Sequence, residues 1–204
     1  MSVSKDNNLA EACRKLRIAD KRLGNIIDKV GPCTLKPHTA DFYFLVDAII
    51  GQQISTRAAT TITSRLQQLF NDKKPTAKAF LNIPKEKVLS TGVSGRKYDY
   101  ILDLAQRIDR RQLCLKSLSE TNDSEVREKL MEVKGIGKWT ADMFLLFGLG
   151  RLDVFPLHDF ALRRAMSLVY DIQMDDHEAL LRIASRWAPY RSVGTWYMYR
   201  SINT

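Results

Sequence analysis

Apolar residues recur at spacings of about three and four along almost the whole chain, which is typical of amphipathic helices. The first segment of this kind starts near Leu9 and continues until Gly31 and Pro32 end it. A second runs from Asp41 to Phe70, with a break expected at Gly51. Further helices are expected over residues 83–91, 96–108, 124–133, 138–148, 159–170, 176–187 and 191–201. Residues 151–158 read as a loop with Pro156 as its breaker, in which only RLDVF at residues 151–155 could form a short strand. The pattern therefore predicts an all-α fold with short connections.

Composition adds a charge imbalance to this picture. The chain has 204 residues, enough for one large or two small domains, and 45% of them are hydrophobic. It carries 32 Lys and Arg against 23 Asp and Glu, a formal net charge of +9. Such an excess favours a polyanionic partner, although a basic protein without one has the same composition.

Cysteine usage and the chain start bear on the compartment. The three cysteines, Cys13, Cys33 and Cys114, are far apart in sequence, which argues against a disulfide framework, a zinc site or an iron–sulfur cluster. The first residues are polar and lack the apolar core of a signal peptide. Apolar runs such as FYFLVDAII are too short to span a bilayer. We therefore expect a soluble intracellular protein without a membrane partner.

A glycine hairpin, VKGIGKWTADM at residues 133–143, lies between two predicted helices. Glycines there can adopt positive φ and leave the backbone uncovered, and a helix N-terminus with unpaired N–H groups binds anions. The groups expected to form the site are the N–H groups of Gly135, Gly137 and Thr140, with the side chains of Lys134 and Lys138. With the basic charge, we interpret the hairpin as a binding site for DNA phosphate. A tight helix–helix turn with nothing bound is the alternative.

The same region resembles a known family. LMEVKGIGKWTADMFLLFGLGRLDVFPLHDFALRR resembles the helix-hairpin-helix, Gly/Pro-rich loop and aspartate signature of the DNA glycosylase superfamily that includes endonuclease III. Three further stretches, LVDAIIGQQISTRAA, GVSGRKYDYILDLA and WAPYRSVGTWYMYR, resemble its 3-methyladenine DNA glycosylase II subgroup. The resemblance covers nearly everything from Asp41 onward. It implies two helical subdomains with an active-site cleft between them. One comprises residues 1–40 and about 145–204, and the other comprises about 41–144 with the hairpin at 130–143.

By this resemblance Asp159 is the catalytic aspartate. Taken alone, Asp159 reads as the N-cap of the helix that follows, and the two roles are compatible because a helix N-terminus keeps a carboxylate anionic. Such a carboxylate can stabilise positive charge on the deoxyribose as the glycosidic bond breaks. Related lyases carry a lysine where this chain has Trp139, so the resemblance implies a monofunctional glycosylase.

The resemblance also implies roles for other side chains. Trp139 and Tyr199 correspond to base-pocket positions, and Met143 lies one helical turn beyond Trp139. Gln53 corresponds to the wedge that fills the space left by an extruded base, and Gln52 reads as a structural hydrogen-bonding residue. Arg57, Arg96 and Lys97 are candidate phosphate contacts, with solvated surface charge as the alternative.

Together these observations predict an enzyme of base excision repair. It would bind double-stranded DNA as a monomer, flip a damaged base and excise alkylated purines such as 3-methyladenine and 7-methylguanine. No cofactor, iron–sulfur cluster or metal-ligating residue is expected beyond a structural monovalent cation at the hairpin. The compartment would be the cytoplasm and nucleoid of a bacterium or the nucleus of a eukaryote. The alternatives are a glycosylase for oxidised or mismatched bases and a non-catalytic helix-hairpin-helix DNA-binding protein.

Overall fold

The computed structural model describes residues 2–70 and 75–202, with side chains from residue 8 onward. Within these ranges every regular element is a helix, and the predicted all-α class is confirmed. None of the helices described is both long and apolar enough to cross a bilayer. The first seven residues, part of the polar start used in the compartment prediction, have no described side chains.

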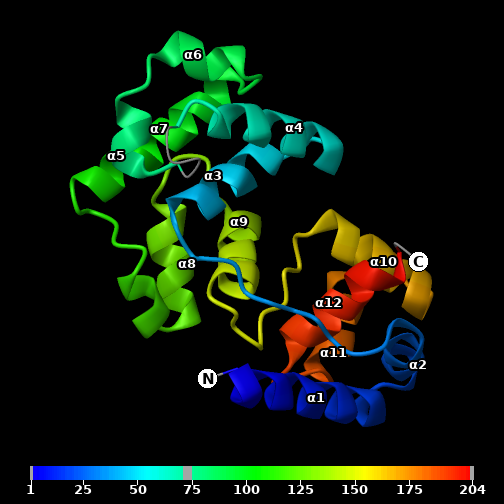
Figure 1. Cartoon of the computed structure of the whole chain (residues 1–204). Helices are drawn as coiled ribbons and strands as arrows, with labels where there is room; N and C mark the ends of the chain where they lie inside the picture. The colour runs from blue at the N-terminus through cyan, green and yellow to red at the C-terminus, as the bar shows by residue number, and fades with distance from the viewer. Residues whose placement is uncertain (1, 71–74, 203–204) are drawn as a thin grey trace. The chain divides into compact units, whose positions relative to one another are not determined.

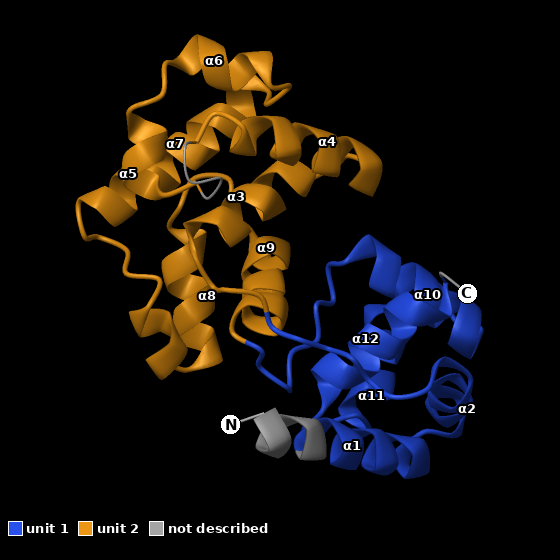
Figure 2. Ribbon diagram, in the orientation of Figure 1, with its two compact units in different colours: residues 1–37, 150–204 blue, residues 38–149 orange. Residues whose placement is uncertain are grey.

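The chain divides into two compact units (Figure 2). Unit 1 consists of residues 1–37 and 150–204, and unit 2 consists of residues 38–149. The expected boundary near residue 145 would cut through the helical turn Phe144–Gly148, which lies whole within unit 2. The boundary between the units therefore follows this turn, between Leu149 and Gly150.

Unit 1 is built from both ends of the chain (Figure 1). Its helices are α1 (Ser2–Ala19), α2 (Lys21–Val30), α10 (Phe160–Tyr170), α11 (His177–Ser185) and α12 (Arg191–Ser201). The single helix expected from Leu9 to Val30 is wrong, because the chain breaks at Asp20. The backbone of Asp20 is extended, with φ −144° and ψ 106°, and its carboxylate caps α2 by accepting hydrogen bonds from the N–H groups of Arg22 and Leu23.

Asp20 is also the polar centre of unit 1. Only 3% of its surface is exposed. Its Oδ2 accepts hydrogen bonds from Tyr170 Oη at 3.0 Å and Trp187 Nε1 at 3.2 Å, and the Arg186 guanidinium lies 3.7 Å away. A buried carboxylate is tolerated only when such partners replace its water. Asp20 therefore ties α1 and α2 to the helices of the C-terminal half.

The apolar core of unit 1 surrounds Trp187 and Tyr197, both fully buried. A Cβ at Gly194 would lie 2.6 Å from the Trp187 ring, so only glycine allows α12 to pack this closely. Burial of two large aromatic side chains contributes much of the hydrophobic stabilisation of this unit.

Residues 151–155 form an irregular loop, as expected, rather than the short strand left open for them, and this loop is anchored to the start of α12. Val154 N donates to Ser192 Oγ at 2.9 Å, and Ser192 N donates to Leu152 O at 2.9 Å. Arg191 forms a two-point ion pair with Asp153, at 2.7 and 2.8 Å. The loop therefore finds partners on a helix end rather than on another strand.

Unit 2 is the central segment of the chain. It contains α3 (Phe42–Gly51), α4 (Thr56–Gln67), α5 (Ala77–Leu81), α6 (Lys85–Ser90), α7 (Gly95–Asp109), a short 3-10 turn (Ser117–Glu120), α8 (Asp123–Met131), α9 (Lys138–Met143) and a π turn (Phe144–Gly148). Gly51 ends α3 as expected. The regular helix expected over residues 138–148 is α-helical only to Met143. Beyond it Leu149 N bonds Phe144 O at 2.8 Å across a widened turn.

Replacing Asp20 with alanine should destabilise unit 1 strongly. The change removes the cap of α2 and leaves the Tyr170 hydroxyl and Trp187 indole N–H without their acceptor. We expect the free energy of unfolding to fall by about 3–5 kcal/mol, measured by urea denaturation.

The matched control is Asp28→Ala, because Asp28 is 60% exposed in its ion pair with Arg17. That variant should lose no more than about 1 kcal/mol. Equal losses in the two variants would show that the Asp20 network does not stabilise the unit.

Candidate DNA interface and base pocket

The hairpin between α8 and α9 depends on Gly135. Its φ is +80°, a left-handed conformation that side chains rarely adopt. A Cβ there would also lie 2.1 Å from the Tyr100 ring of α7. Two independent constraints therefore require glycine at this position.

Gly137 differs, and the positive φ expected for it is wrong. Its backbone is extended, with φ −106° and ψ −176°, and a Cβ would meet no atom within 4 Å. It is the N-cap of α9 and makes no side-chain capping bond. The fold therefore does not require glycine at residue 137. A ligand that lies close against the start of α9 would require it, because a side chain there would occupy the same space.

The other predicted hairpin residues have divided roles. The Lys134 and Lys138 side chains are exposed, while the Lys134 backbone N–H donates to Asp103 Oδ2 at 2.8 Å. Thr140 is 1% exposed, and its Oγ1 accepts a hydrogen bond from Gln52 Nε2 at 3.1 Å. The Thr140 side chain therefore holds the hairpin in place.

Gln52 links the end of α3 to the hairpin. Its Nε2 donates to Gly135 O at 3.0 Å as well as to Thr140 Oγ1, which agrees with the structural role expected for it. The backbone around Gln52 is held in turn by Lys97, whose Nζ donates to Ile50 O at 2.7 Å and to Gln52 O at 2.9 Å. Burial, together with the neighbouring charge of Arg96, lowers the pKa of Lys97. Lys97 therefore supports the backbone at the end of α3, and a phosphate contact by this residue stays a prediction.

The turn after α3 carries the predicted wedge. Gln53 is exposed and has φ 57°, which is uncommon for a residue other than glycine. Ile54 beside it is 37% exposed, and Arg57 in the first turn of α4 is exposed. A strained, exposed turn held by part-buried hydrogen bonds is typical of a functional loop.

A pocket of about 490 Å³ in unit 2 brings Trp139 and Met143 together. This volume lies within the range of about 300–1,000 Å³ found for ligand sites. Its other lining residues are His38, Thr39, Asp41, Tyr43, Phe44, Asp47, Ala48 and Phe147. The wall is thus largely aromatic, with two carboxylates.

The carboxylates and Tyr43 belong to a polar edge that the sequence did not reveal. Asp47 Oδ1 accepts a hydrogen bond from Thr63 Oγ1 at 2.8 Å, and the Tyr43 hydroxyl accepts one from Gln67 Nε2. Burial, reinforced by the charge of Asp47, raises the pKa of Tyr43, so its hydroxyl remains protonated at neutral pH. The run FYFLVDAII reads as an apolar helix, and only the polar groups of Tyr43 and Asp47 within it could have signalled a pocket.

Asp159 is in unit 1, at the N-cap of α10. It is 9% exposed, and its Oδ1 accepts a hydrogen bond of 2.6 Å from Leu162 N. Its own N–H donates to Pro156 O at 2.9 Å, which fixes the backbone. Tyr199 belongs to the same unit, on α12, and is half-buried. The carboxylate therefore has a fixed orientation at the positive end of a helix.

Among the described residues, no group of three or more His, Cys, Asp or Glu side chains is placed to hold a metal ion. The expected monovalent cation would need backbone carbonyls of the hairpin, where Gly135 O already accepts the Gln52 amide. That cation stays a prediction.

Comparison with known proteins identifies the family. Residues 46–189 match the model of the HhH-GPD superfamily base excision DNA repair proteins, and they include the hairpin, the pocket residues Trp139 and Met143, and Asp159. The chain belongs to this superfamily.

Relatives within the HhH-GPD superfamily confirm the subgroup. The chain is 29% identical to the alkylbase DNA glycosidase-like protein mag2 of Schizosaccharomyces pombe, over 97% of this chain and 96% of that protein. A DNA-3-methyladenine glycosidase of Bacillus halodurans is 32% identical, with a TM-score of 0.83 over 95% of this chain and 89% of that one. The 3-methyladenine DNA glycosylase Mag1 of S. pombe, solved with abasic DNA, is 25% identical with a TM-score of 0.85, over 95% and 97%. The predicted kinship with 3-methyladenine DNA glycosylases is thus confirmed.

Alanine should destabilise the fold strongly at one hairpin glycine and weakly at the other. Gly135→Ala should lower the free energy of unfolding by about 2–5 kcal/mol, because the methyl group meets Tyr100 and the φ is left-handed. Gly137→Ala should lower it by less than about 1 kcal/mol. Chemical denaturation of both variants measures this contrast.

Gly137→Ala should nevertheless weaken DNA binding by about tenfold, because its methyl group covers the N–H groups at the start of α9. Fluorescence anisotropy with a duplex containing an abasic-site analogue measures the affinity. Unchanged affinity in this folded variant would rule out the start of α9 as a DNA contact.

Proposed function

We propose that this protein is a monofunctional DNA glycosylase of base excision repair that excises alkylated purines such as 3-methyladenine and 7-methylguanine. The observation that carries the proposal is the aromatic pocket around Trp139, which has two carboxylates in its wall. The superfamily match and the names of the relatives support the reaction class.

Asp159 would stabilise the reacting sugar. As the bond between C1′ and the base nitrogen breaks, its electrons leave with the base and positive charge develops on the deoxyribose. A carboxylate oriented by Leu162 N and the dipole of α10 stabilises this charge without reorganising. Water then attacks C1′ and loses a proton, which leaves an abasic site.

The pocket composition supports a cationic base as substrate. Purines alkylated at N3 or N7 carry positive charge, which favours the faces of aromatic rings and nearby carboxylates. Trp139 supplies the largest ring, and Asp47 and Asp41 supply negative charge in a chain of net charge +9. A base that is already cationic leaves as a neutral molecule and needs little help from a general acid.

The residue at position 139 favours hydrolysis over strand cleavage. A lyase needs an amine that attacks C1′ and forms a Schiff base, and the indole of Trp139 has none. Lys138 is exposed, and adjacent residues differ by about 100° around a helix, so its side chain points away from the face of Trp139. The enzyme would therefore leave the DNA strand intact.

DNA would be held without reading its sequence. The hairpin at residues 134–138 would bind phosphate through backbone N–H groups and lysines, with Arg57 as a further contact. Gln53 would fill the space left by the flipped base. We expect a monomer to be sufficient for this reaction on duplex DNA.

Asp159→Asn tests the catalytic role. Asparagine caps a helix about as well as aspartate, so the fold should persist while the negative charge is lost. Base release should fall by about 10²–10³-fold, measured by chromatography of bases freed from methylated DNA.

Asp176→Asn is the matched control, because Asp176 caps α11 through Ala179 N at 2.9 Å. It should excise bases at the rate of the unsubstituted protein. If Asp159→Asn also did so, Asp159 would have no catalytic role.

In the unsubstituted enzyme, the DNA strand should break only after alkali, and covalent trapping by borohydride would instead indicate a lyase.

Trp139→Ala and Asp47→Asn test the preference for cationic bases. Removing the indole should cost about 1–3 kcal/mol of base stacking and reduce excision of 7-methylguanine more than that of neutral hypoxanthine. Asp47 is exposed, so solvent weakens its effect on a charged base. Asp47→Asn should therefore reduce the ratio of 7-methylguanine excision to hypoxanthine excision by only about fivefold.

Single-turnover excision of both bases by each variant gives these ratios. Asp175→Asn, a surface charge change in unit 1, serves as the control for net charge. Equal losses for the charged and the neutral base would mean that the pocket does not recognise charge.

A further inference from the structure

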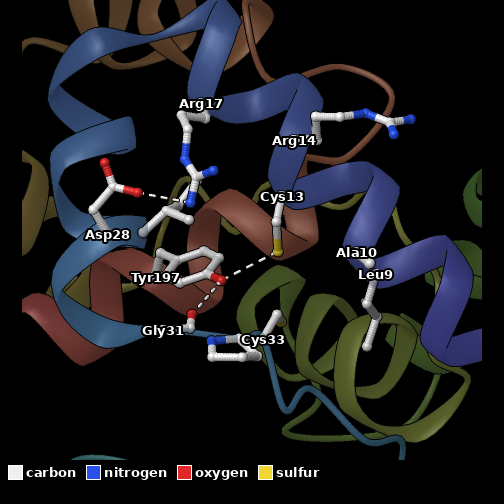
Figure 3. Close-up of a pocket in the computed structure, with 11 residues that line it drawn as sticks. Leu9, Ala10, Cys13, Arg14, Arg17, Asp28, Gly31, Cys33 and Tyr197 are labelled. Carbon is white, nitrogen blue, oxygen red and sulfur yellow. Dashed lines mark hydrogen bonds and ion pairs between the residues drawn. The ribbon is translucent and has the colours of Figure 1, made fainter.

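Two cysteines that are distant in sequence share a cavity in unit 1. Cys13 on α1 and Cys33 after α2 both line a space of about 540 Å³, and both are half-buried (Figure 3). The wall of this cavity also includes Tyr197, Arg14 and Arg17, whose polar groups can influence the reactivity of the two thiols. The residues proposed for DNA binding and base excision do not line this cavity, so it is separate from that function.

A tyrosine hydroxyl connects the two sides of the cavity. Tyr197 Oη lies 3.1 Å from Cys13 Sγ and donates a hydrogen bond of 2.8 Å to Gly31 O. Gly31 has φ 81° and turns the chain after α2, so that Cys33 follows on the side of Cys13 (Figure 3). The thiols are thus held near each other by a buried aromatic residue and by the end of α2.

The surroundings make the two thiols unequal. Hydrogen bonding with Cys33 and the charge of Arg17 lower the pKa of Cys13 to about 6, although its burial acts in the opposite direction. The interaction with Cys13, followed by burial, raises the pKa of Cys33 well above its usual range. Cys13 therefore ionises more readily than Cys33.

We propose that Cys13 and Cys33 form a peroxide-sensitive dithiol that closes into an intramolecular disulfide. A reactive cysteine next to a second thiol is the arrangement of a redox-sensitive pair. The oxidant class is a hydroperoxide, of which hydrogen peroxide is the smallest and fits easily into the cavity.

The oxidation proceeds in two balanced steps. The Cys13 thiolate attacks one peroxide oxygen, the O–O bond breaks, and hydroxide leaves as Cys13 becomes a sulfenic acid. The Cys33 sulfur then attacks the Cys13 sulfur, the S–O bond breaks, and a second hydroxide leaves. The proton of Cys33 and one from solvent convert both hydroxides to water. The sulfurs together lose two electrons, and the peroxide gains them.

The cross-link would constrain the segment of chain that leads from α2 to unit 2. Cys33 lies between the end of α2 and the start of unit 2 at residue 38. A bond to Cys13 would fix this stretch to α1. Reduction by a dithiol would release it.

Titration with hydrogen peroxide tests the proposal on the full chain. After the remaining thiols are alkylated, intact mass should show the loss of two hydrogen atoms, and peptide mapping should find Cys13 joined to Cys33. Dithiothreitol should reverse the change. Interchain disulfides, or a wild-type chain in which oxidised Cys13 remains a sulfenic acid, would overturn the proposal.

Three variants assign the roles of the cysteines. Cys33→Ser should stop at a sulfenic acid on Cys13 that dimedone captures, and Cys13→Ser should not accumulate sulfenic acid at Cys33. Cys114→Ser should form the disulfide as the wild type does, because Cys114 is exposed and belongs to unit 2. Equal sulfenic acid formation at Cys33 in Cys13→Ser would contradict the assigned order.

The pH dependence of alkylation gives an independent readout. Iodoacetamide reacts with the thiolate, so the rate at Cys13 should fall about tenfold per pH unit below a midpoint near pH 6. In Cys33→Ala, which lacks the hydrogen-bond donor, this midpoint should move to higher pH. A midpoint unaffected by Cys33→Ala would show that the two thiols do not interact and would overturn the pair.

Discussion

The hydrogen bonds that Gln52 donates to the hairpin are the interaction on which the candidate interface depends. One amide nitrogen reaches Gly135 O and Thr140 Oγ1, so the end of α3 and the start of α9 are fixed to each other. The turn that carries Gln53 and the hairpin that carries the lysines therefore behave as one rigid block. DNA contacts that require both elements need no ordering of one against the other.

Helix α7 supports this block along one side. Lys97 holds the carbonyl end of α3, Tyr100 packs on Gly135, and Asp103 accepts the N–H of Lys134. Residues three apart lie on neighbouring positions of a helix surface, so these contacts come from a single stripe. The cost of burying the Lys97 ammonium is offset by two carbonyl groups at the negative end of α3.

Local signals in the sequence predicted the parts of the fold that local chemistry determines. Ser94 and Asp159 cap their helices through N–H groups three residues ahead, which a sequence displays directly. The break at Asp20 was missed because its deciding partners, Tyr170 and Trp187, are remote in sequence. Family resemblance identified Trp139 but gave no indication of Asp47, since a single carboxylate within an apolar helix reads as solvated. Sequence spacing likewise gave no reason to place Cys13 beside Cys33.

The π turn at residues 144–148 gives this segment a tolerance of one residue in length. A π turn holds one residue more than the α turn it replaces, and here it lies between the pocket residue Met143 and the exit from unit 2. Loss of a single residue would let the turn relax to an α turn, so that the residues after it keep their orientation, whereas the same loss in a regular α-helix would rotate them by about 100°. Phe147, which lines the pocket and whose carbonyl accepts a hydrogen bond from His38 N, lies within the turn and would bear the change. A one-residue deletion is therefore easier to accommodate here than within α7.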